Sequence, residues 1–198
     1  MASNDKLRVL CLHGYRQNGE TLRSRIAAFR RAFKSSVEFV CVDAPIVLQN
    51  DHSAKNDSSS GKVTLSHVDE SIEYIAKICR EQGPFDGIFG FSQGGTIASL
   101  TVQRQHVKPE DWPAPFRFAI FVSAPHSQDP NYGDRELKLE MPSLHMIGET
   151  DTVVNPKSSQ ILAAGFVAPT TFGHAGGHHI PANKEAKDAF RDFFKQLQ

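Results

Sequence analysis

A serine framed by glycines stands near the middle of the chain, in the segment Gly90-Phe91-Ser92-Gln93-Gly94. An apolar stretch leads into this G-x-S-x-G pattern and a helical pattern leads out of it. A sharp strand-to-helix turn of this kind raises the serine Oγ above a sheet, where it can act as a nucleophile. The first helical turn then points amides at a developing oxyanion. In the simpler alternative, Ser92 only caps the helix.

A nucleophilic serine needs a base and an orienting carboxylate, and candidates for both follow it. Asp151 lies in the loop after the apolar stretch 143–147, and His178 lies in the glycine-rich segment 174–181. The order serine, acid, histidine is that of α/β-hydrolases. Glu149 is the rival acid, but Asp151 sits further into its loop, where a side chain can turn towards a histidine.

Three histidines within one short segment also suggest a metal site: His174, His178 and His179. No paired cysteine or carboxylate accompanies them at ligand spacing, so the sequence favours a site without metal. The remaining histidines are most simply surface or packing residues, although His13 belongs to the next motif.

A second glycine motif follows the first apolar stretch and reads LHGYRQNG over residues 12–19. A His-Gly pair at this place supplies an oxyanion amide from the residue after the glycine, here Tyr15. Its partner is the amide of Gln93, directly after the serine. Taken alone, the motif could be only a glycine-rich loop that leads to a helix.

Short apolar runs alternate with helical patterns along the chain. The runs predict strands over 7–13, 37–42, 85–91, 116–122, 143–147 and 166–172, and the patterns predict helices over 20–34, 66–82, 93–105, 156–164 and 183–197. Ser66 with Asp69 resembles a capping box, and the polar segment 49–62 is typical of a mobile surface loop. We therefore expect a single α/β domain over residues 1–198, with a mostly parallel sheet of about six strands and helices on both faces. Sites in such sheets lie at the carboxyl ends of the strands.

The composition limits which classes of partner and which cellular compartment the sequence favours. The chain has 22 basic and 22 acidic residues, and no basic cluster that would favour nucleic acid. No apolar run approaches the ~20 residues needed to span a bilayer, and the N-terminus lacks the layout of a targeting segment. Three cysteines inside apolar patterns, Cys11, Cys41 and Cys79, are typical of free thiols in a reducing compartment. We expect a cytoplasmic protein; a nuclear or dual location and the oligomeric state stay open.

Five segments together resemble the fungal-type family of small serine hydrolases, which includes an ovarian-tumour-associated esterase of animals. They are LCLHGYRQNG (10–19), VDAP (42–45), GPFDGIFGFSQGG (83–95), the stretch 148–154 and HAGGHHIP (174–181). The resemblance implies an α/β-hydrolase fold with a minimal lid and a triad of Ser92, Asp151 and His178. His178 is preferred to His179 because the family's histidine directly follows the Gly-Gly pair.

The same resemblance implies a carboxylesterase, and some fungal relatives act as thioesterases on acyl chains. The triad chemistry needs no cofactor, and we expect a small-molecule ester or thioester to lie near Phe91 and Pro125. Two departures affect the pocket. Segment 49–62 lacks the aromatic residues of relatives, and residues 123–126 read Ser-Ala-Pro-His where relatives have Ser-Gly-Phe. Substrate specificity therefore does not transfer. The competing hypothesis is a hydrolase-fold protein that binds a ligand with little turnover.

Overall fold

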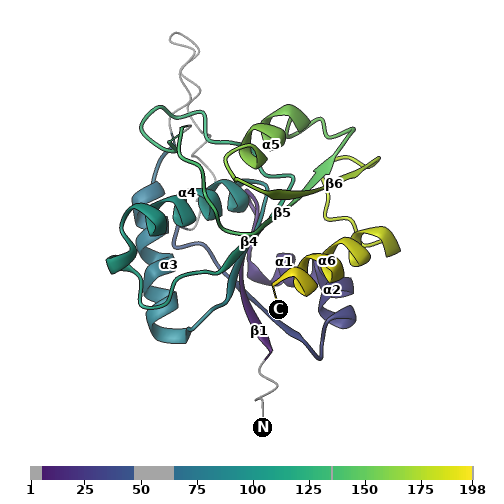
Figure 1. The fold of residues 1–198 in the computed structure, drawn as a ribbon, viewed down its shortest axis with the longest axis horizontal. Coiled ribbons are helices and arrows are strands. Elements are labelled where there is room, and N and C mark those ends of the chain that lie inside the picture. Colours follow the sequence, from purple (N-terminus) through teal and green to yellow (C-terminus); the bar gives the residue numbers. More distant parts are fainter. Residues whose placement is uncertain (1–5, 47–64, 135, 198) are drawn as a thin grey trace.

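A computed structural model describes residues 6–46, 65–134 and 136–197 of the chain. Six strands form one parallel sheet in the order β2-β1-β3-β4-β5-β6 (Figure 1). They are β1 (Leu7–Leu12), β2 (Val37–Val42), β3 (Gly87–Phe91), β4 (Phe118–Val122), β5 (Ser143–Gly148) and β6 (Pro169–His174). Parallel strands share their carboxyl edge, so the loops after β1, β3, β5 and β6 emerge on one side.

Helices cover both faces of the sheet (Figure 1). On one face lie α3 (Val68–Gln82) and α4 (Gln93–Val107), with α5 (Pro156–Ala163) near β5; η1 (Pro109–Asp111) follows α4. On the other face lie α1 (Gly19–Arg25), α2 (Ala27–Ala32) and α6 (Lys184–Gln196). The predicted α/β fold, with six strands and two helical layers, is confirmed. None of the described helices has the length and apolar character to cross a bilayer.

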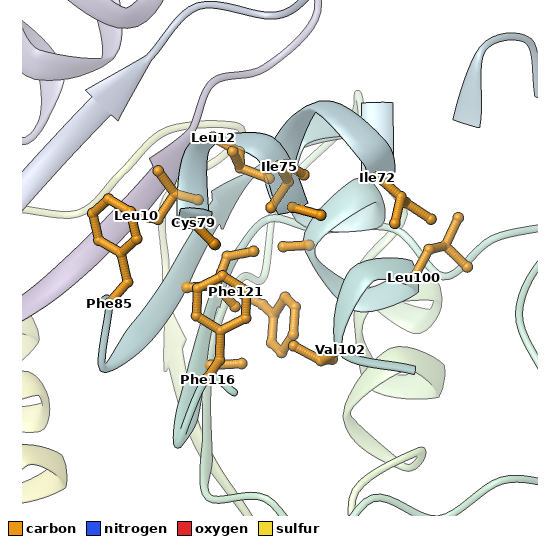
Figure 2. Packing of buried hydrophobic residues seen from close by; sticks show 14 of the residues in the cluster. Leu10, Leu12, Ile72, Ile75, Cys79, Phe85, Leu100, Val102, Phe116 and Phe121 are labelled. Carbon is orange, nitrogen blue, oxygen red and sulfur yellow. The ribbon is translucent and has the colours of Figure 1, made fainter. Parts of the chain in front are cut away.

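Alternate residues of each central strand point into two hydrophobic cores, one on each face of the sheet. Leu10 and Leu12 of β1 join the core under α3 and α4, which Figure 2 shows from close by. Val9 and Cys11 point the other way, into a core rich in phenylalanine. Phe29 of α2 stacks there on Phe190 of α6 with ring centroids 4.1 Å apart. A strand buried on both faces explains why its sequence is almost continuously apolar.

Some predicted boundaries differ from the structure. The helix predicted over 20–34 is divided at Ile26 into α1 and α2, although its apolar stripe is buried as expected: Leu22, Ile26, Phe29 and Phe33. The predicted last strand begins later, because Phe166 forms an isolated bridge to Leu139 outside the sheet. The predicted loop 49–62 lies outside the described residues.

The predicted capping box at Ser66 is wrong. The N-cap of α3 is His67 in a left-handed conformation, and its side chain does not cap the helix. Asp69, the other residue of the expected box, turns away and accepts hydrogen bonds from Arg104 and Tyr132. Its carboxylate therefore ties α3 to neighbouring segments rather than to its own first turn.

His145 is a titratable residue inside the β5 region of the core. Its ring stacks on Phe121 with centroids 4.9 Å apart, and its Nε2 lies 3.0 Å from Ser143 Oγ. Burial lowers the pKa of His145 to about 3. The folded protein therefore keeps this imidazole neutral over a pH range in which the unfolded chain, with a pKa near ~6.5, binds a proton.

We predict that the free energy of unfolding falls as pH is lowered from about 6.5 to about 3, by up to ~1.4 kcal/mol per pH unit from His145 alone. The sign follows because the unfolded state binds more protons in this window. His145→Gln should remove this part of the slope, whereas His106→Gln at an exposed position should leave it. Urea unfolding at a series of pH values measures both; equal pH dependence in wild type and His145→Gln would contradict the assignment.

Candidate active site

The turn between β3 and α4 has an unusual backbone. Ser92 has φ 55° and ψ −124°, a region that residues with a side chain seldom occupy. Its N–H donates to Val122 O at 3.0 Å, which ties the turn to the end of β4. Ser92 stands at the N-cap of α4, yet its side chain makes no capping hydrogen bond. The interpretation of Ser92 as a simple helix cap is therefore wrong.

Two glycines allow the turn to close. A Cβ at Gly90 would lie 2.4 Å from Gly95 Cα, and a Cβ at Gly94 would lie 2.4 Å from the carbonyl oxygens of Leu12 and His13. Real Cβ atoms do not approach backbone so closely. Gly90 thus lets β3 meet the first turn of α4, and Gly94 lets α4 pack against the loop after β1.

Ser92, His178 and Asp151 form a continuous chain of hydrogen bonds. His178 Nδ1 lies 2.8 Å from Asp151 Oδ2, and His178 Nε2 lies 3.0 Å from Ser92 Oγ. An ionised carboxylate only accepts hydrogen bonds, so Nδ1–H donates to Asp151. In a neutral imidazole Nε2 is then an acceptor, and Ser92 O–H donates to it.

Asp151 is held as a carboxylate. Burial, the largest single influence, raises its pKa. The pKa is nevertheless lowered overall, because the backbone N–H of Val154, the His178 ring and the N–H of Val153 donate to the carboxylate. The two backbone bonds end on Oδ1 at 2.8 and 2.9 Å, which leaves Oδ2 for His178.

The loops that carry the acid and the histidine are fastened to each other. Thr150 N–H donates to Gly176 O at 3.3 Å, and Thr150 Oγ1 donates to Ala175 O at 3.0 Å. Gly148, at the end of β5, has no room for a Cβ, which would lie 2.6 Å from Gly177 O. The position of His178 relative to Asp151 is therefore set by backbone contacts as well as by their own hydrogen bond.

The neighbouring candidates, His179 and Glu149, make other contacts. The ring of His179 packs against His174, with centroids 5.0 Å apart. Glu149 is exposed and lines a pocket beside α5 and β6. Within the described ranges, no group of three or more histidine, cysteine, aspartate or glutamate side chains is placed to hold a metal ion.

The loop after β1 is fixed by residues whose role the sequence did not reveal. Ala44 N–H donates to His13 Nε2 at 3.1 Å, so His13 Nδ1–H donates to Gly14 O at 2.9 Å. Asp43 Oδ1 accepts from Gly19 N–H at 2.7 Å. The VDAP segment thus clamps both ends of this loop. The sequence places VDAP directly after a strand, but the contact of VDAP with the loop after β1 can be recognised only because β2 pairs with β1.

Gly14 brings the same loop against Ser92. A Cβ there would lie 3.3 Å from Ser92 Cβ and 3.4 Å from Gln17 Nε2. Among the described residues, Gln17 Oε1 is a buried polar atom without a hydrogen-bond partner. Gln17 was not singled out from the sequence. Tyr15 follows Gly14 and Gln93 opens α4, so both predicted oxyanion amides belong to segments that meet at Ser92.

The two predicted substrate contacts differ in exposure. Phe91 is 1% exposed, and its ring centroid lies 5.0 Å from that of His178. Pro125 is half-buried in the segment after β4, where its carbonyl accepts from Thr96 Oγ1 at 2.9 Å.

Comparison with known proteins gives consistent results. The profile of the family described as Serine hydrolase (FSH1) matches residues 1–190. "Esterase CG5412" of Drosophila melanogaster is 34% identical, over 96% of this chain and 74% of the fly protein. "Esterase OVCA2" of Homo sapiens is 30% identical, over 100% of this chain and 99% of the human protein.

Solved structures with lower identity share the fold. Arabidopsis thaliana SOBER1 superimposes with a TM-score of 0.69 at 19% identity, covering 98% of this chain and 100% of the plant protein. Zea mays acyl-protein thioesterase 2 superimposes with a TM-score of 0.62 at 17% identity, covering 98% and 95%.

We predict that Gly94→Ala destabilises the protein by about 1–3 kcal/mol, because the added methyl group meets two backbone carbonyls that cannot move aside independently. Gly165→Ala is the matched control: its Cβ would meet Leu162 O at 3.1 Å, and a smaller loss is expected. Urea unfolding of the three proteins measures the difference. Equal losses in the two variants would show that the contact between α4 and the loop after β1 is not restrictive.

Proposed function

Because the chain belongs to the serine hydrolase (FSH1) family, we propose that it hydrolyses carboxylic esters of small molecules, and also acyl thioesters, through a triad of Ser92, His178 and Asp151. The observation that carries the proposal is the chain of hydrogen bonds of 2.8 and 3.0 Å that joins these three side chains. The three residues come from three different loops. Ser92 stands at a strained turn that a structural serine would not require.

In the acylation step, Ser92 Oγ attacks the substrate carbonyl carbon while His178 Nε2 accepts the hydroxyl proton. Asp151 stabilises the resulting imidazolium and keeps its Nδ1–H directed at the carboxylate. The amides of Tyr15 and Gln93 donate to the oxyanion, supported by the N-terminus of α4. His178 then gives its proton to the leaving alcohol or thiol, and an acyl group remains on Ser92.

Deacylation repeats the sequence with water. His178 removes a proton from a water molecule, whose oxygen attacks the acyl carbon, and the same proton returns to Ser92 Oγ as the acid leaves. The chemistry needs no cofactor, since this chain's own groups supply the nucleophile, base and oxyanion donors.

The surroundings suggest different roles for the two predicted substrate contacts. Phe91 lies under His178 and supports the imidazole, so its influence on substrate passes through the histidine. Pro125 belongs to the half-exposed segment after β4 and is the better candidate for contact with the acyl or alcohol group. The free thiols support a cytoplasmic location for the reaction.

We predict that Ser92→Ala lowers ester hydrolysis by at least about 10⁴-fold, because the nucleophile is lost. A fluorophosphonate probe should label wild type at Ser92 and leave the variant unlabelled. Activity is measured on esters and thioesters of graded acyl length, with urea unfolding to verify the fold. Binding of an ester without turnover by wild type would favour the ligand-binding alternative, and labelling at another serine would refute the nucleophile.

Asp151→Asn should lower turnover by about four orders of magnitude, because an amide can donate to His178 and favour the wrong imidazole tautomer. Glu149→Gln is the matched control two residues away; its side chain is exposed, and near wild-type turnover is expected. Steady-state kinetics on one ester compares them. If Glu149→Gln were the inactive variant, Glu149 would be the orienting acid.

A further inference from the structure

Two thiols lie side by side on the first two strands, next to the loop that follows β1. Cys11 of β1 and Cys41 of β2 are partners in the parallel register. Register partners in a parallel sheet project to the same face, and both side chains belong to the core beside α1 and α2. Both cysteines are free in the structure.

The spacing of the two strands suits a disulfide. Neighbouring strands lie about 4.7–4.9 Å apart, and disulfides join residues whose Cα atoms are about 4.4–6.8 Å apart. Cys11 Sγ lies 3.4 Å from Val9 O of its own strand, and the parallel register places Cys41 beside Cys11 on the neighbouring strand. A bond between them therefore requires little movement of the backbone.

The surroundings make the two thiols chemically unequal. Burial, followed by the influence of the neighbouring Cys41, raises the pKa of Cys11 well above its usual value. The neighbouring Cys11 side chain, the largest influence, lowers the pKa of Cys41; burial and Glu20 oppose this, while Arg30 and Arg23 assist it. Cys41 is thus the better nucleophile of the pair, and Cys11 is placed to react second.

Small polar reagents can reach only one of these sulfurs directly. Cys11 is 0% exposed, whereas Cys41 is half-buried and lines a surface pocket of about 370 Å³. The pocket is also lined by Asn18, Gly19, Glu20, Arg23 and Asp43. Its polar wall and its arginine suit a small, polar, hydrogen-bonding molecule such as a hydroperoxide.

We propose that Cys41 and Cys11 form a peroxide-reactive pair, in which Cys41 is the site of oxidation and Cys11 the resolving thiol. The Cys41 thiolate attacks one peroxide oxygen, the O–O bond breaks, and hydroxide leaves and takes up a proton, which yields a sulfenic acid and water. Cys11 sulfur then attacks Cys41 sulfur; the sulfenic hydroxyl leaves with the Cys11 proton as a second water. Two thiols lose two electrons, and hydrogen peroxide gains them.

The direct test uses the full-length wild-type protein and hydrogen peroxide. After treatment, free thiols are blocked and the protein is digested with trypsin without reduction. The cleavage sites place Cys11 in peptide 9–16, Cys41 in peptide 35–55 and Cys79 in peptide 78–80. We expect a cross-link between the first two peptides that disappears on treatment with a dithiol reductant, while Cys79 stays free.

Cys79 serves as an internal control, because burial raises its pKa to about 11. At pH 7 we expect oxidation of Cys41 to be at least about tenfold faster than that of Cys79, since the thiolate is the reacting form. Absence of both cross-link and Cys41 sulfenic acid would overturn the proposal. Oxidation of Cys79 at an equal or greater rate would do the same.

Variants separate the two roles. Cys11→Ser should prevent the cross-link and allow dimedone, which reacts with sulfenic acids, to label Cys41. Cys41→Ser should leave Cys11 unoxidised, and Cys79→Ser should form the cross-link as wild type does. Labelling of Cys11 in the Cys41→Ser protein would reverse the assignment and refute it. The wild-type peptide map decides the outcome even if a substitution at buried Cys11 prevents folding.

Discussion

The backbone at Ser92 is the constraint on which the remaining site depends. A residue with a side chain in this conformation costs on the order of 1–3 kcal/mol, and it persists only where neighbouring segments leave no alternative. Here β4 holds the serine N–H, while α4 is pressed against the loop after β1 through Gly94. The same contacts that stabilise the turn bring the loop after β1 to Ser92, so the strained backbone and the approach of this loop depend on one set of contacts.

A second pair of loops holds His178 beside Asp151. The segments after β5 and β6 approach so closely that Gly148 has no space for a side chain, and Thr150 donates to two carbonyls of the opposite loop. Asp151 directs one oxygen to its own loop and the other to His178. The imidazole is consequently oriented by its hydrogen bond to Asp151, by the contacts between the two loops and by the ring of Phe91 beside it.

The sequence was informative where local pattern and burial coincide. Continuously apolar runs such as 116–122 predicted buried strands, and the motif around Ser92 predicted a turn whose geometry the structure contains. Patterns failed where a distant partner competes: Asp69 binds Arg104 and Tyr132 instead of capping its helix. The hydrogen bonds of His13 and Asp43 could not be predicted either, because they depend on β2 lying beside β1.

The hydrogen-bonded chain at Ser92 also depends on the order in which its residues are synthesised. Ser92 and His178 are separated by 86 positions, and β6, which precedes the histidine loop, is the last strand to be synthesised. At about 5–20 residues per second, the ribosome releases Ser92 several seconds before His178. A serine without a base is a weak nucleophile, so under the proposed mechanism Ser92 stays unreactive in the nascent chain until β6 and the loop after it join the sheet.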